Sequence, residues 1–215
     1  MVLAVEPARS GLGEIVITMN AKQLFVQTLK TPSEAGAQVM RLQWPIQALW
    51  MALSLVSVIT SLIFAVLMQL APMGEDQFSD LMRASPAHSA PLIFALLQWG
   101  RAIVSVFVLY WIGRMMGGTG QLRDVLAVMA WLQAVTFVLM IGLIVIGAIL
   151  PMLSSLLILA MVIWWIWAIV SVLNVAHGFD SMFKAGAVLI LSLLGVTVGM
   201  SIFFGAISAL FVGVS

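Results

Sequence analysis

Five long apolar segments, separated by short polar breaks, dominate the pattern of this chain. Each is long enough to cross a hydrocarbon core of about 30 Å as a helix of about 20 residues. Because backbone groups find no water in that core, a spanning segment must be helical. The pattern therefore predicts an all-α polytopic integral membrane protein, with a five-helix transmembrane bundle over residues 46–215. The predicted spans are Ile46 to Leu70, Leu92 to Ile112, Val125 to Ile149, Leu153 to Asn174 and Ala185 to Val214.

Two of these spans form a predicted hairpin, and three aromatic residues lie inside one of them. Only Leu150, Pro151 and Met152 join the third span to the fourth, so these two spans should pack as a tight antiparallel pair. In the fourth span three tryptophans lie too deep for the interfacial belt, and we expect them to pack between helices. They are Trp164, Trp165 and Trp167.

A polar segment, residues 19–45, precedes the first span and predicts two short cytoplasmic amphipathic helices. Between Ala21 and Lys30 the residues Leu24, Phe25, Thr28 and Leu29 share one face. The run Thr31-Pro32-Ser33-Glu34 has the pattern of a capping box, so a second helix should start there and run toward Arg41. These helices either lie on the membrane surface, sensing lipid or docking a partner, or rest against the inner face of the bundle.

The first eighteen residues show neither apolar periodicity nor a targeting signal. We expect residues 1–18 to be a disordered and dispensable extension, with Met19 as a candidate start.

Composition agrees with a lipid environment and excludes several functions. Hydrophobic residues make up 63% of the chain and charged residues 8%, against about 25% charged in an ordinary soluble domain. A net charge of +1 provides no basic field, so no nucleic-acid partner is expected. The chain has no cysteine, which excludes disulfides, thiolate metal sites and cysteine nucleophiles.

Basic residues near the span ends predict the orientation. With the N-terminus in the cytoplasm, the outer side carries only Arg83, accompanied by Glu75, Asp76 and Asp80. After five crossings the C-terminus would be outside. The inner side then carries Lys30, Arg41, Arg114, Arg123 and Lys184.

No catalytic, metal or cofactor motif stands out, so no enzyme, metal or cofactor is expected. The glycines of Gly117-Gly118-Thr119-Gly120 resemble a phosphate loop, but no lysine follows and a turn between spans is the simpler interpretation. His177 and Asp180 are too few ligands for a metal site.

Arg101 is the one basic residue inside a predicted span, near its middle. Either it snorkels or pairs structurally, or it marks a substrate, lipid-headgroup or proton pathway. Gln98, Gln133 and Asn174 are its candidate partners in an intramembrane polar cluster.

Small residues form a stripe along the last span. Such a stripe allows another helix to approach closely, either a span of this chain or one of a second copy, although small residues are also common in membrane helices. The stripe consists of Thr197, Ser201, Gly205, Ala209 and Gly213, with Gly195 and Gly199 as a second pair.

Four sequence motifs, in this order, resemble the Yip domain family of Ypt/Rab-interacting proteins, over about Met19 to Val214. They are Arg41-Leu42-Gln43-Trp44-Pro45 followed by Ala48-Leu49-Trp50; Gly117-Gly118-Thr119-Gly120; Ala130-Trp131-Leu132-Gln133; and Ala176-His177-Gly178-Phe179 before Lys184-Ala185.

The resemblance implies a non-enzymatic membrane protein, and it marks Pro45, Gly117, Gly118, Gly120, His177 and Gly178 as family-motif turns. Eukaryotic members of the family act in membrane traffic and contact Rab-type GTPases. Here the acidic motif before the first span is replaced by Arg41-Leu42-Gln43-Trp44-Pro45 and the long N-terminal domain is missing, which argues against a Rab-type GTPase and for a bacterial member.

Two functions follow from these observations. The first is a membrane-organising or partner-binding scaffold, whose partners are membrane lipids and another membrane protein or a second copy. The second is a small transporter or lipid-translocating protein that uses the polar cluster around Arg101.

Overall fold

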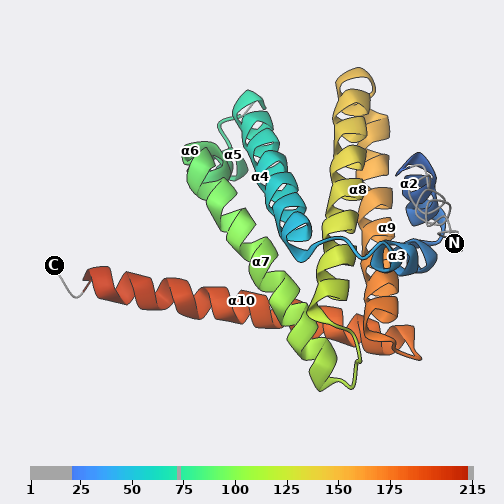
Figure 1. Ribbon diagram of the computed structural model, residues 1–215. Coiled ribbons are helices and arrows are strands. Elements are labelled where there is room, and N and C mark those ends of the chain that lie inside the picture. Colours follow the sequence, from blue (N-terminus) through green and yellow to red (C-terminus); the bar gives the residue numbers. More distant parts are fainter. Residues whose placement is uncertain (1–20, 72–73, 213–215) are drawn as a thin grey trace, which may run out of the picture.

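The computed structural model describes residues 21–71 and 74–212, which form helices and contain no strand. Five of the described helices are long and apolar enough to span a membrane, and these are α4, α7, α8, α9 and α10 over Met182–Ser201. The predicted all-α, multi-pass architecture is therefore confirmed (Figure 1). In chain order the helices are α2 (Ala21–Lys30), α3 (Pro32–Arg41), α4 (Ile46–Leu70), α5 (Gln77–Ala84), α6 (Pro86–Ser89), α7 (Pro91–Met115), α8 (Leu122–Ile149), α9 (Pro151–His177) and α10 (Met182–Val212).

Helices α7 and α9 extend slightly beyond the predicted spans at both ends, α8 and α10 begin three residues before them, and α4 has the predicted bounds. Pro91 and Pro151 are the first residues of α7 and α9, where the missing N–H of proline costs nothing. At the start of α8 the backbone N–H of Gln121 donates to Asp124 Oδ2 at 3.0 Å. The helices therefore extend beyond the apolar segments, into the polar and proline residues that flank them.

The α8–α9 hairpin is the centre of the molecule. The two helices run side by side, joined only at Leu150. Helix α4 packs on α7 and α8, and α10 packs on α7 and α9. The largest buried side chains come from α4, α8 and α9, and include Leu53, Leu126, Leu132 and Leu173.

Helix α10 crosses the hairpin steeply, and its C-terminal half extends away from the bundle (Figure 1). The face that it buries carries Ala185, Val188, Leu189 and Ser192, at the spacing of one helical stripe.

The two N-terminal helices have the predicted bounds, and they pack along the side of the hairpin rather than beneath its inner end. The indole Nε1 of Trp131 donates to Thr28 Oγ1 at 2.9 Å, and that of Trp164 donates to the Leu29 carbonyl at 3.2 Å. Trp164 is the middle residue of α9, so the end of α2 lies beside the middle of a span. Trp164 and Trp165 are half-buried as expected, whereas Trp167 is 43% exposed.

The predicted capping box at the start of α3 is wrong, although Pro32 does occupy the first helical position. The hydroxyl of Thr31 caps no backbone N–H. It donates instead to Glu34 Oε2 at 3.2 Å, and Gln27 Nε2 donates to the same oxygen at 3.1 Å. The carboxylate thus ties α2 to α3 because a charged acceptor competes well for the hydroxyl proton.

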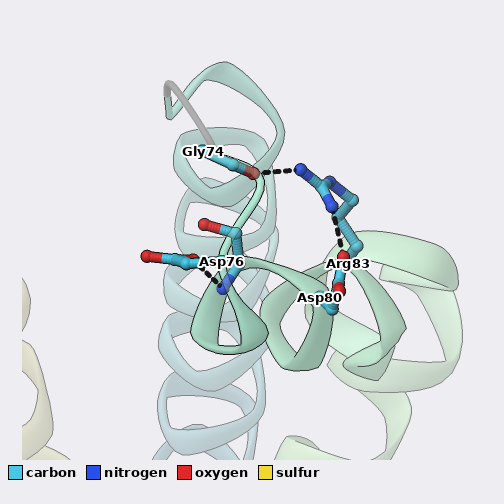
Figure 2. A network of polar contacts seen from close by, with 5 residues as sticks. Gly74, Asp76, Asp80 and Arg83 are labelled. Carbon is cyan, nitrogen blue, oxygen red and sulfur yellow. Dashed lines mark hydrogen bonds and ion pairs between the residues drawn. The ribbon is translucent and has the colours of Figure 1, made fainter.

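Two short helices that the sequence reading missed, α5 and α6, connect α4 to α7. Figure 2 shows the start of α5, where the Ser79 N–H donates to Asp76 Oδ1 at 2.7 Å. Hydrogen bonds from Ser79 hold the pKa of Asp76 below its usual value. Arg83 pairs with Asp80 at 2.5 Å and donates to the Gly74 carbonyl, which closes the turn.

Candidate functional site

The turn between α7 and α8 is bound to the C-terminal end of α9. The Thr119 N–H donates to the His177 carbonyl at 2.9 Å, and its hydroxyl donates to the same oxygen at 3.3 Å. The Gly118 N–H donates to the Gly113 carbonyl at 2.9 Å. Because these amides are used within the chain, the glycine turn is not arranged as a phosphate loop.

His177 is fully buried beneath this turn. Its Nδ1 lies 3.2 Å from the Leu173 carbonyl, and its ring stacks on Phe179 with the centroids 5.3 Å apart. A Cβ added at Gly113 would lie 2.0 Å from His177 Nε2, so only glycine fits beside the ring. We call Gly113, Gly117 to Gly120, His177 and Gly178 the helix junction.

Close backbone contact also requires glycine elsewhere in the helix junction. A Cβ at Gly120 would lie 2.0 Å from the Ala176 carbonyl oxygen, a separation that no side chain could relieve. Gly178 has a φ of 64° and ends α9 in the left-handed conformation that favours glycine. Across the described part of the chain no group of three His, Cys, Asp or Glu side chains could hold a metal ion.

The turn before α4 is fixed by a residue from the start of α8. Arg123 Nη2 donates to the carbonyl of Gln43 and, at 2.7 Å, to that of Trp44. Gln43 has a positive φ of 49°, and Pro45 then precedes the first residue of α4. The family-motif turns therefore hold the ends of neighbouring helices against one another.

A second candidate site is a cavity of about 430 Å³ between α4, α7, α8, α9 and α10. Most of its walls are Leu, Ile, Val, Met and Phe side chains, and Trp165 joins them. We call it the polar cavity, because its lining also includes Thr60, Arg101, Ser105, Gln133, Thr136, Ser192 and Thr197.

The polar cavity contains part of the predicted polar cluster. Arg101 Nε donates to Gln98 Oε1 at 3.0 Å, and Arg101 and Gln133 line the cavity together. Arg101 lies ten residues after Pro91, which is about 15 Å along the helix and near the middle of α7. Among the described residues no carboxylate lines this cavity.

Asn174 lies elsewhere, at the end of α9. In the amide orientation that satisfies its neighbours, its nitrogen donates to the carbonyls of Phe179 at 3.2 Å and Ser181 at 3.1 Å. Asn174 therefore closes the turn between α9 and α10, and it does not lie with Arg101 in the predicted polar cluster.

Two hydroxyls of the polar cavity lack a hydrogen-bond partner among the described residues. They are Thr60 Oγ1 and Ser192 Oγ, whereas Thr136 and Thr197 donate to carbonyls of their own helices at 2.8 Å. A buried polar group left unsatisfied costs about 1–3 kcal/mol. The sequence reading missed Thr60 and Ser192, since nothing in an apolar span distinguishes a satisfied hydroxyl from an unsatisfied one.

The described residues of the small-residue stripe of α10, Thr197 and Ser201, are exposed and do not belong to the face packed on the bundle. A Cβ at Gly195 would be in ordinary contact with Val108 of α7 at 3.6 Å, but one at Gly199 would meet nothing within 4 Å. Ser201 is exposed, and its hydroxyl donates to the Thr197 carbonyl. Gly205 and Ala209 lie on a part of α10 whose side chains the structure does not describe, and Gly213 lies outside the described residues, as do residues 1–18.

Comparison with known families identifies the chain. The Yip1 domain model matches residues 26–213, which confirms the resemblance drawn from the sequence motifs. The match includes the second half of α2 and all later helices. No curated protein and no solved structure matches the chain.

Proposed function

The chain belongs to the Yip1 domain family, and on this basis we propose that it is a non-catalytic membrane scaffold that binds another membrane protein or a second copy of itself. The observation that carries the proposal is the position of α2. Its apolar face packs on the α8–α9 hairpin, and its polar face points away from the bundle at the depth of Trp164, the middle residue of α9.

The polar face of α2 requires a cover that hydrocarbon does not provide. A groove of about 620 Å³ between α2 and α3 is lined by Lys22, Gln23, Val26, Gln27, Lys30, Thr31 and Glu34. Lys30, an exposed lysine of this groove, would cost about 2.5–3.5 kcal/mol at the centre of a bilayer. A partner that brings polar side chains to this groove removes that cost, which favours association in the plane of the membrane.

Photo-crosslinking in native membranes tests the scaffold. A photoreactive residue at Gln23, which lines the groove, should give protein adducts at a defined mass, twice that of the chain if the partner is a second copy. The matched control is Gln77, an exposed glutamine of α5, which lies in the connection between α4 and α7 and away from the groove. Adducts to lipid alone at Gln23, or identical patterns at both positions, would reject the proposal.

We further propose that the helix junction faces the cytoplasm. Arg114, Arg123 and Lys184 gather there at the ends of α7, α8 and α10, whereas Arg83 lies with the acidic residues of α5 at the opposite end. The excess of basic residues on the cytoplasmic side supports this orientation. With this orientation we infer that the protein lies in a bacterial inner membrane, with its C-terminus on the periplasmic side.

Cysteine labelling tests this orientation, since the chain has no cysteine of its own. In intact cells a membrane-impermeant maleimide should label Gln77→Cys, and it should label Asp180→Cys only after permeabilisation. Both positions are exposed, so accessibility is matched. The opposite order of labelling would invert the topology.

A second candidate function is translocation of a lipid or solute, and the observation that favours it is the polar cavity. Arg101 and Gln133 both line this cavity, and the exposed side chain of Arg101 lies where the cavity opens at the surface of the bundle. A flux or lipid-flip assay in liposomes should then show activity that Arg101→Leu abolishes. If the unaltered protein shows no activity in this assay, translocation is rejected and the scaffold is the remaining proposal.

A further inference from the structure

The polar cavity combines one cation with two unsatisfied hydroxyls. Ser192 is only 3% exposed, and neither its Oγ nor Thr60 Oγ1 has a hydrogen-bond partner in the described part of the chain. Arg101 donates to the neutral amide of Gln98 at 3.0 Å. The described lining therefore offers donors and a positive charge, and it offers no negative charge to balance them.

The rest of the lining sets a second requirement for an occupant. Leu132, Phe137 and Ile169 are among the apolar side chains that make up most of the walls. A hydrated ion would gain nothing from such walls, whereas a hydrocarbon chain would bury against them. The volume of about 430 Å³ lies within the range of small-molecule sites, about 300–1,000 Å³.

We propose that the polar cavity binds a membrane amphiphile with a single hydrocarbon chain and one anionic headgroup, either a carboxylate or a phosphate monoester. The guanidinium of Arg101 has the fork of donors that matches both anions, and hydrogen bonds to a charged acceptor are the strong ones. The hydroxyls of Ser192 and Thr60 complete the headgroup site, and the apolar walls hold the chain. The inference deepens the second candidate function, but it requires binding only and no transport.

Equilibrium binding to the full-length protein in phosphatidylcholine nanodiscs tests the proposal. The probes are radiolabelled oleate, oleoyl lysophosphatidate, oleyl alcohol and inorganic phosphate. Oleate or lysophosphatidate should bind saturably, and oleyl alcohol should bind at least about 10-fold more weakly because it lacks the charge. Preference between the two anions identifies the source as a fatty acid or as a phospholipid product.

Variants assign the binding to the polar cavity. Arg101→Leu should weaken anion binding about 10- to 100-fold, and Arg101→Lys should weaken it less because the charge remains. Ser192→Ala should weaken binding about 2- to 10-fold. The matched control is Ser171→Ala on α9, since Ser171 is equally buried but its Oγ already donates to the Trp167 carbonyl at 2.7 Å.

Several outcomes would overturn the inference. Equal binding of oleyl alcohol and oleate would remove the role of the anion, and phosphate binding as tight as that of lysophosphatidate would remove the role of the chain. Unchanged binding by Arg101→Leu would place the ligand elsewhere. Binding without flux would reject translocation and support the site, while failure of the Gln23 crosslinks would reject the scaffold alone.

Discussion

Gly113→Ala tests the packing of the helix junction. The added Cβ would lie 2.0 Å from Nε2 of His177, far inside van der Waals contact. The ring cannot move aside easily, because it is fully buried, stacked on Phe179 and held at Nδ1 near the Leu173 carbonyl. The substitution must therefore displace α7 from the end of α9 or force His177 from its position.

The expected cost is large relative to the stability of a membrane bundle. Overpacking a buried site costs about 1–3 kcal/mol, and we expect Gly113→Ala at the upper end, about 3 kcal/mol, because the ring is fixed on two sides. The matched control is Gly142→Ala in the C-terminal half of α8, where a Cβ meets nothing within 4 Å. There alanine should leave stability unchanged or raise it by up to about 1 kcal/mol through helix propensity.

Unfolding in mixed micelles, followed by circular dichroism, measures both variants. Combining Gly113→Ala with His177→Ala should cost less than the sum of the two single variants by more than about 1 kcal/mol, since the alanine methyl then occupies space that the ring has left. Equal stabilities of Gly113→Ala and Gly142→Ala, or strictly additive effects in the double variant, would refute the close contact between α7 and His177.

Three further predictions concern other contacts. Trp131→Phe removes the hydrogen bond to Thr28 and should lower stability by about 1 kcal/mol. The measurement is proteolysis of α2, which should become faster; an unchanged rate would contradict the packing of α2 on α8. Because hydrogen bonds lower the pKa of Asp76, the stabilisation of α5 that they provide should be present above the unfolded pKa and lost as pH falls through the folded one; a Ser79 amide whose hydrogen-exchange protection does not decrease in acid would disprove this. Arg123→Gln should loosen the turn before α4 and lower the melting temperature, whereas Arg123→Lys should restore it only in part because lysine lacks the fork.

The spans could be predicted from the sequence because each one is a long apolar segment, a property of consecutive residues. The bounds of α2 and α3 could also be predicted from consecutive residues, because α2 has an apolar face at helical spacing and Pro32 occupies the first position of α3. Helices α5 and α6 were missed because their signals are single residues, Asp76 as an N-cap and Pro86 at a first helical position. The predicted capping box does not form because the Thr31 hydroxyl donates to the Glu34 carboxylate, which also accepts from Gln27.

Contacts between distant residues were beyond the sequence pattern. Nothing in the order of residues relates Gly113 to His177 or Arg123 to the turn before α4. The face of α10 was similarly hidden, because small residues and apolar residues both recur at helical spacing, and the packed stripe is the one with Ala185 and Val188. Only the arrangement of all helices decides which stripe is covered.

The helix junction and the polar cavity both contain buried polar atoms without a partner among the described residues, but they differ in the space around those atoms. In the helix junction the amides of Gly118 and Thr119 both donate within the chain, and the glycines are required by contacts with His177 and Ala176. The motifs that carry the family resemblance therefore report how helix ends pack. In the polar cavity, whose lining also includes Arg101, the hydroxyls of Thr60 and Ser192 are unsatisfied, at a cost of about 1–3 kcal/mol for each hydroxyl. His177 Nε2 in the helix junction is likewise unsatisfied, but Gly113 packs directly against it and leaves no space for a ligand. The polar cavity has a volume of about 430 Å³ beside its unsatisfied hydroxyls, so a ligand is expected there and not in the helix junction.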